Sequence, residues 1–147
     1  MHHERVISAS RLISAPLDAV WAVLASPAGH VAMDGSGTVL GVASGPETLV
    51  LGSRFRMKMK VGVPYRVRST VVEFDEGRRI AWAHFGGHRW RFELEPTEGG
   101  TMVTESFDWS TSRSPRFIER VGYPRRHEAT LRDTLERLEK VVASAGG

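Results

Sequence analysis

Hydrophobic and polar residues alternate along most of the chain after residue 37. In residues 53–61, Phe55, Met57 and Met59 take one side, and arginine or lysine takes each position between them. A period of two is that of a β-strand with one buried face. The period predicts six strands, at residues 38–43, 53–61, 65–75, 79–85, 88–96 and 101–110. Short turn sequences separate most of them, which predicts antiparallel hairpins.

Before this region the pattern is that of a strand followed by a helix. Residues 4–13 alternate loosely and carry β-branched side chains, so they predict a first strand. Pro16 suits a first helical turn, and apolar residues then recur at helical spacing at Leu17, Val20, Trp21 and Leu24. Pro27 ends this helix, and the stretch to about Asp34 has room for one more helical turn before a glycine-rich connection.

A long helix is predicted at the end of the chain. Ser114 and Pro115 are typical of a helix start, and a helical stripe follows at His127, Leu131, Leu135, Leu138 and Val142. Pro124 predicts a kink or split, with the long part beginning near Arg125. Only this helix is long enough to cover the apolar face of the sheet. We therefore expect one α+β domain over residues 1–147, in which a curved seven-stranded antiparallel sheet wraps around the C-terminal helix.

Two details of the strands bear on which side chains point inward. Within residues 65–75 the inward positions change from odd to even residue numbers between Val71 and Val72, which predicts a β-bulge. A two-residue turn at Gly86 and Gly87 would pair Phe85 with His88 and place Trp82 and His84 outside. A loop one residue longer would turn both of them inward, and the sequence leaves both registers open.

Several motifs resemble the START-like, SRPBCC superfamily, in particular its polyketide cyclase/dehydrase proteins. The opening carries Ile13-Ser14-Ala15-Pro16, Val20-Trp21, Leu24 and Pro27, and the last predicted hairpin carries residues 90–96 and 99–106. The resemblance covers nearly the whole chain and implies the helix-grip fold. Members of this superfamily include binders of lipids and other apolar molecules as well as aromatase/cyclase subunits. We recognise no reaction-specific motif, so no catalytic residue is carried over.

Composition narrows the function classes. The 147 residues include no cysteine, which excludes disulfides, thiolate metal sites and a cysteine nucleophile. No apolar run approaches the roughly 20 residues of a membrane span, and the N-terminus is too polar for a signal peptide. We therefore expect a cytoplasmic protein without a bound cofactor, either a monomer or a homodimer.

Large apolar side chains are abundant on the face that should point inward. Together with the resemblance, they predict a cavity that binds a hydrophobic small molecule of lipid, polyketide or aromatic type. The predicted lining consists of Phe55, Met57, Met59, Trp90, Phe92, Phe107, Trp109, Phe117, Tyr123, His127 and Leu131.

Three polar residues are candidates for chemistry in such a cavity. His127 lies on the helical stripe, Glu105 shares the inward parity of Val103, and Tyr123 approaches from the last helix region. They leave open an enzyme of the cyclase or dehydratase type, in which these groups move protons. Structural roles are the alternative for each. His84 and His88 straddle a turn without a third ligand, so we expect no metal site.

The outward positions form a basic pattern. It comprises Arg54, Arg56, Lys58, Lys60, Arg66, Arg68, Arg89 and Arg91. The pattern is typical of a solvated β face, where arginine also discourages aggregation. The alternative is an interaction module that attracts a phosphate-rich partner or an anionic membrane surface. No aromatic residue is interleaved to stack bases, which argues against nucleic acid.

Overall fold

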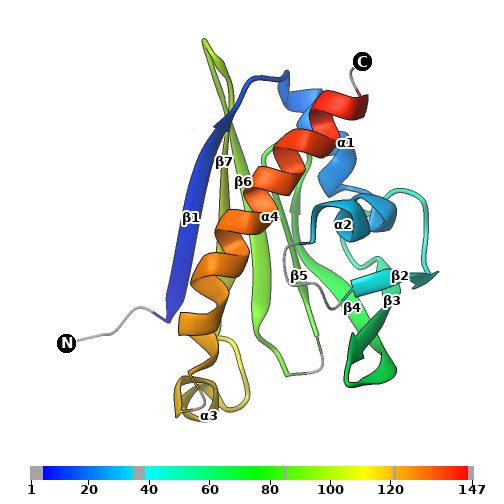
Figure 1. The fold of residues 1–147 in the computed structure, drawn as a ribbon, viewed down its shortest axis with the longest axis vertical. Helices are drawn as coiled ribbons and strands as arrows, with labels where there is room; N and C mark the ends of the chain where they lie inside the picture. The colour runs from blue at the N-terminus through cyan, green and yellow to red at the C-terminus, as the bar shows by residue number, and fades with distance from the viewer. Residues whose placement is uncertain (1–4, 35–38, 85, 121, 146–147) are drawn as a thin grey trace.

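A seven-stranded antiparallel sheet, in the order β1-β7-β6-β5-β4-β3-β2, curves around the C-terminal helix (Figure 1). The computed structural model describes residues 5–34, 39–84, 86–120 and 122–145. The strands are β1 (Val6–Ile13), β2 (Val39–Ser44), β3 (Arg54–Val61), β4 (Val63–Asp75), β5 (Arg79–Ala83), β6 (Arg89–Thr97) and β7 (Gly100–Asp108). The helices are α1 (Leu17–Leu24), α2 (Pro27–Met33), α3 (Pro115–Arg120) and α4 (Tyr123–Ala145). The predicted helix-grip architecture is confirmed.

The bulge in β4 is confirmed, and the register of β5 is now fixed. The pairing of β4 with β5 shifts between Val71 and Glu73. Trp82 pairs with Trp90, and Ala83 pairs with Arg89. Of the two registers that the sequence left open, the structure has the one with the connection longer by one residue, which turns Trp82 and His84 inward. Phe85, which the two-residue turn would have paired with His88, lies outside the described residues.

Two prolines act at helix starts. Pro27 opens α2 as well as following α1, and the Ser26 hydroxyl caps α2 by accepting from the Gly29 N–H at 3.3 Å. The expected split of the last helix is present, but it falls at Gly122, which has a φ of 72°. Pro124 then lies within the first turn of α4, where proline is tolerated. The glycine-rich connection at 35–37 lies outside the described residues.

The core lies between the inner face of the sheet and the helices. In Figure 1 α4 crosses in front of β6 and β7, while α1 and α2 pack beside its second half. The apolar stripe of α4 is buried as predicted, at Leu131, Leu135, Leu138 and Val142. From the sheet, Phe55 and Phe92 contribute the largest fully buried side chains of β3 and β6. The alternating pattern of these strands thus turns one face toward α4.

Candidate functional site

A cavity of about 160 Å³ lies between the inner face of the sheet and α4. Strands β2 to β7 supply most of its walls, and α2 and α4 supply the rest. The lining residues are His30, Met33, Asp34, Val39, Phe55, Met57, Met59, Val67, Ser69, Trp82, His84, Trp90, Phe92, Glu105, His127, Thr130 and Thr134. Most of the lining is apolar or aromatic, which is typical of sites for small organic molecules.

The structure brings together most of the residues that the alternating pattern singled out. Phe55, Met57, Met59, Trp90, Phe92, Glu105 and His127 all line the cavity. Phe107, Trp109 and Leu131 are buried but do not line it. Phe107 instead packs behind the lining, with its ring centroid 4.6 Å from Trp90 and 4.8 Å from His127.

Phe117 and Tyr123 are the two remaining residues of the predicted lining. Phe117 is 64% exposed, and α3, on which it lies, buries none of its residues. The expectation that Phe117 reaches the cavity is wrong, because α3 ends at Arg120 as a separate short helix and does not continue the apolar stripe of α4. The side chain of Tyr123 lies outside the described part of the chain.

Several lining residues were not predicted. Val67 and Ser69 share the inward parity of β4, so the sequence pattern contained a signal for them. Trp82 and His84 depended on the register of β5. His30 gave no signal, because α2 is too short to define an apolar face. Its ring stacks on Trp82 at a centroid distance of 4.2 Å.

The two histidines on the wall formed by α2, β4 and β5 are held by hydrogen bonds. His30 Nε2 lies 2.7 Å from the Leu24 carbonyl oxygen and donates to it. His84 Nδ1 lies 2.9 Å from the Ser69 hydroxyl. Burial lowers the pKa of His30 to about 4, and burial together with the nearby His88 lowers the pKa of His84 to about 4. Both rings are therefore neutral at pH 7 and act as polar but uncharged walls.

Glu105 places a carboxyl group in this apolar space. It lies on β7 opposite Phe92 of β6 and is 4% exposed. Among the described residues, its Oε2 atom has no hydrogen-bond partner. Burial, with a smaller contribution from Asp34, raises the pKa of Glu105 well above its ordinary value. When protonated, this carboxyl group can donate a hydrogen bond to an acceptor in the cavity.

The described residues contain no group of three histidine or acidic side chains that is placed to hold a metal ion. Within the same residues, no helix has both the length and the apolar character needed to cross a membrane.

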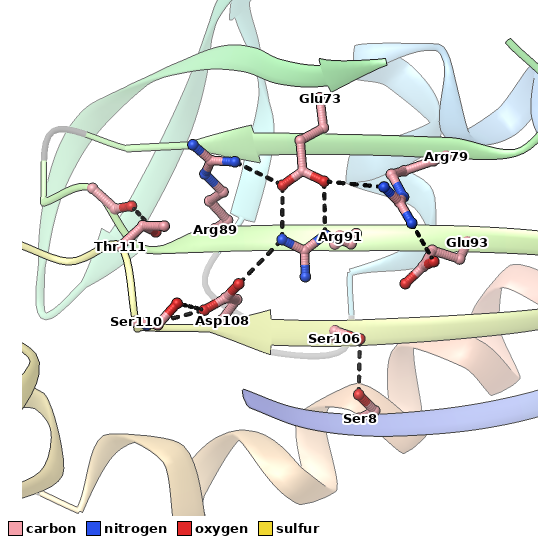
Figure 2. A network of polar contacts seen from close by, with 11 residues as sticks. Ser8, Glu73, Arg79, Arg89, Arg91, Glu93, Ser106, Asp108, Ser110 and Thr111 are labelled. Carbon is pink, nitrogen blue, oxygen red and sulfur yellow. Dashed lines mark hydrogen bonds and ion pairs between the residues drawn. The ribbon is translucent and has the colours of Figure 1, made fainter. Parts of the chain in front are cut away.

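On the outer face of the sheet, part of the predicted basic pattern is neutralised. Glu73 of β4 accepts from Arg89 at 2.8 Å and from Arg91 at 2.7 and 2.9 Å, as Figure 2 shows. Arg91 also donates to Asp108 at 3.1 Å. Hydrogen bonds from Arg91, and then from Arg89, lower the pKa of Glu73 to about 2 despite its partial burial. Arg89 and Arg91 are thus not free cations, contrary to the sequence-based expectation.

Comparison with known proteins relates this fold and cavity to one family. Residues 4–143 match the family described as "Polyketide cyclase / dehydrase and lipid transport". The chain is 39% identical over 145 residues to the uncharacterized protein Rv0088 of Mycobacterium tuberculosis. The match covers 93% of this chain but 64% of that protein, so the chain spans less than two thirds of this relative's length.

Solved structures share the fold at low sequence identity. Protein NE0264 of Nitrosomonas europaea superposes with a TM-score of 0.74 at 17% identity, with 99% of each chain covered. The AHSA1-like protein of Aeromonas hydrophila gives a TM-score of 0.70 at 23% identity, with 96% of this chain and 94% of that one covered. At these identities the likeness concerns the fold alone.

Proposed function

The chain belongs to the polyketide cyclase/dehydrase and lipid transport family, and from this premise we propose that it binds a small hydrophobic molecule in the cavity beneath α4. The observation that carries the proposal is the lining, in which aromatic and methionine side chains from β3, β5 and β6 face a buried space. Such side chains offer large apolar contact areas, and methionine adapts to the shape of a ligand.

The size of the cavity restricts the part of the ligand that it takes up. A volume of about 160 Å³ is close to that of an engineered apolar cavity of about 150 Å³ that holds benzene. The cavity therefore suits one ring or a short chain segment, and a larger ligand would extend beyond it. Aromatic molecules and acyl chains both meet this condition.

Glu105 adds a polar requirement. Its protonated carboxyl group gains a hydrogen bond when the buried end of the ligand carries an acceptor such as a carbonyl or hydroxyl oxygen. A carboxylate ligand would instead place two acids in one apolar space, which is unfavourable. We therefore favour a neutral molecule with an apolar body and one oxygen function.

The test is a binding screen with the full chain. Neutral ring-containing and acyl compounds, among them polyketides and lipids, are tested by native mass spectrometry and by quenching of tryptophan fluorescence. Trp82 and Trp90 line the cavity, so a ligand placed there should quench their emission. If no compound of the panel binds and the cell-expressed protein retains none, the proposal is wrong.

A matched pair of variants locates the binding. Val67→Phe fills the cavity from β4, whereas Thr70→Phe adds the same ring on the opposite face of the same strand. We expect roughly tenfold weaker binding for the first variant or more, and no change for the second. Equal affinities of the two variants would place the ligand elsewhere.

A second candidate function is that of a cyclase- or dehydratase-type enzyme. It is favoured by one observation, namely that Glu105 and His127 line the same cavity. A carboxylic acid with a raised pKa can protonate a leaving oxygen, and a histidine can remove a proton. This function requires turnover of a bound compound and its loss in both Glu105→Gln and His127→Ala. Full turnover in His127→Ala would exclude the role of this histidine.

A further inference from the structure

The outer face of the β3–β4 hairpin carries six cations, which we call the cationic hairpin face. They are Arg54, Arg56, Lys58 and Lys60 of β3 with Arg66 and Arg68 of β4, and all six are exposed. Arg56 pairs directly with Arg68, and Lys58 pairs directly with Arg66. Side chains at paired positions point to the same side, so these four charges form a compact square on one surface.

This arrangement is electrostatically unfavourable for the isolated protein. Like charges at directly opposed positions of two strands destabilise the pair. Within the described part of the chain, no ion pair joins any of the six cations to a carboxylate. On the same sheet face, by contrast, Glu73, Glu93 and Asp108 neutralise the arginines of β5 and β6 (Figure 2). Among the described residues, the sheet thus compensates one group of cations and supplies no carboxylate partner to the other.

The closed end of the hairpin is apolar and exposed. Val63 is 71% exposed and Tyr65 is 44% exposed, and both lie next to the turn between β3 and β4. Leu40, on the neighbouring strand β2, is 57% exposed and lies between the residues that pair with Met59 and Lys58. We call these three residues the apolar tip. Tyr65 pairs with Met59 and Val63 shares its orientation, so both leave the hairpin on the face opposite the cations. A hairpin with cations on one face and with aliphatic side chains and a tyrosine at its exposed end suits tip-first contact with the interfacial layer of a bilayer.

We propose that the β3–β4 hairpin docks this protein on an anionic membrane surface, with the cationic hairpin face on lipid phosphates and the apolar tip in the interfacial layer. A nucleic acid would use the cations but would have no use for exposed Leu40 and Val63. The cationic face also lacks an aromatic side chain on which bases could stack. An anionic bilayer satisfies both groups of residues together.

The proposal does not depend on the function of the cavity, although the two features adjoin. Met59 and Val67, on the inner face of the same hairpin, line the cavity. Docking through the hairpin would therefore bring this wall of the cavity to the lipid surface, from which an apolar ligand can partition.

Vesicle sedimentation tests the docking with the full chain. Vesicles of phosphatidylcholine alone are compared with vesicles of phosphatidylcholine and phosphatidylglycerol in equal parts, at low and at high salt. We expect binding only to the anionic vesicles and release of most of the protein at high salt. Equal binding to both kinds of vesicle would overturn the proposal.

A charge-matched pair of variants separates the hairpin from net charge. The first carries Arg56→Glu, Lys58→Glu, Arg66→Glu and Arg68→Glu, and we expect it to bind at least roughly tenfold more weakly. The control carries Arg116→Glu, Arg132→Glu, Arg137→Glu and Lys140→Glu at exposed positions of α3 and α4 and has the same net charge. Equal losses in the two variants, or no loss in the first, would contradict docking through the hairpin.

Two further variants keep the test decisive. Leu40→Asn with Val63→Asn changes only exposed positions, so folding is preserved, and we expect it to lose the part of the binding that persists at high salt. Unchanged binding of this variant would exclude the apolar tip. Val67→Phe should bind vesicles as the wild type does, so failure of the cavity proposal and failure of the docking proposal are distinguished.

Discussion

Glu105 shows how a single residue can be placed against its own solvation preference. An ionised carboxylate in an apolar cavity loses the stabilisation of water, and the charge of Asp34 disfavours it further. The folded protein therefore favours the protonated group. A hydrogen-bond acceptor that enters the cavity, as proposed above, would give this group a partner.

Replacement of Glu105 by glutamine tests this interpretation through stability. The pKa of Glu105 is raised in the folded state, so the unfolded chain releases the proton first, at about its ordinary pKa of 4.5. Above that pH the free energy of unfolding of the wild type falls by about 1.4 kcal/mol per pH unit, until the pH reaches the folded pKa. Glu105→Gln lacks this loss. Urea unfolding from pH 4 to pH 8 should show an advantage of the variant that grows with pH.

His30 and His84 give the free energy of unfolding the opposite pH dependence. Their effect is the same in the wild type and in Glu105→Gln, so it cancels in this comparison. His30 and His84 have lowered pKa values, so both proteins lose stability as the pH falls from about 6.5 toward about 4. Parallel stability curves of wild type and Glu105→Gln would mean that Glu105 is ionised when folded.

The sequence predicts which way a side chain points where the two-residue period and the burial of apolar groups agree. Phe55, Met57 and Met59 alternate with cations on both sides, and no other orientation would keep the cations in water. His30 could not be predicted in this way. It lies in the middle of a seven-residue helix, and its place in the cavity depends on how α2 packs against Trp82 of β5.

At the level of the strands, β5 lies between β4 and β6, and side chains of these two neighbours form an ion pair across it. Ala81 pairs with Glu73 of β4 on one side and with Arg91 of β6 on the other. Because the alanine side chain is a single methyl group, the carboxylate of Glu73 and the guanidinium of Arg91 can meet across β5, and Ala81 is fully buried. The network thus ties β4, β6 and β7 without a direct backbone pairing of β4 with β6.

A double-mutant cycle measures this tie. Glu73→Gln and Arg91→Met are made singly and together, and we expect a coupling free energy of about 1–3 kcal/mol from urea unfolding. Each single variant should destabilise the protein, because the remaining partner stays partly buried without its ion pair. Additive effects would show that these contacts contribute no joint stabilisation.

The sequence could not reveal this network. The predicted bulge in β4 indicated on which face of the sheet Glu73 lies. The partner of Glu73, however, depends on two registers, those of β4 on β5 and of β5 on β6. One of these was set by the length of the β5–β6 connection, which left two possibilities. The outer arginines therefore read as one continuous basic pattern, although the structure divides them into a paired and an unpaired group.

For the molecule as a whole, α4 holds the sheet in its curved form, and Leu138 is one of its fully buried contacts. Leu138 does not line the cavity. We expect Leu138→Ala to lower the free energy of unfolding by about 2–5 kcal/mol while ligand affinity at low temperature is unchanged. Urea unfolding followed by circular dichroism, with a binding titration beside it, checks both expectations. An equal loss of affinity would mean that the cavity depends on packing along all of α4.

The architecture was predictable because its largest features are repeated in the pattern. Seven segments with a period of two and one long helical stripe leave few ways to bury the apolar faces, and short turns impose neighbouring antiparallel pairs. The cavity itself follows from how closely α4 approaches the curved sheet. That distance depends on the packing of all the helices at once, so the pattern of any one segment does not contain it.

The pairing of β1 with β7 has a consequence for biosynthesis. Val6 pairs with Asp108, so β1 is synthesised well before β7 and its backbone groups on that side wait for this partner. Until then a cell must keep that edge from joining the nascent strands of other copies.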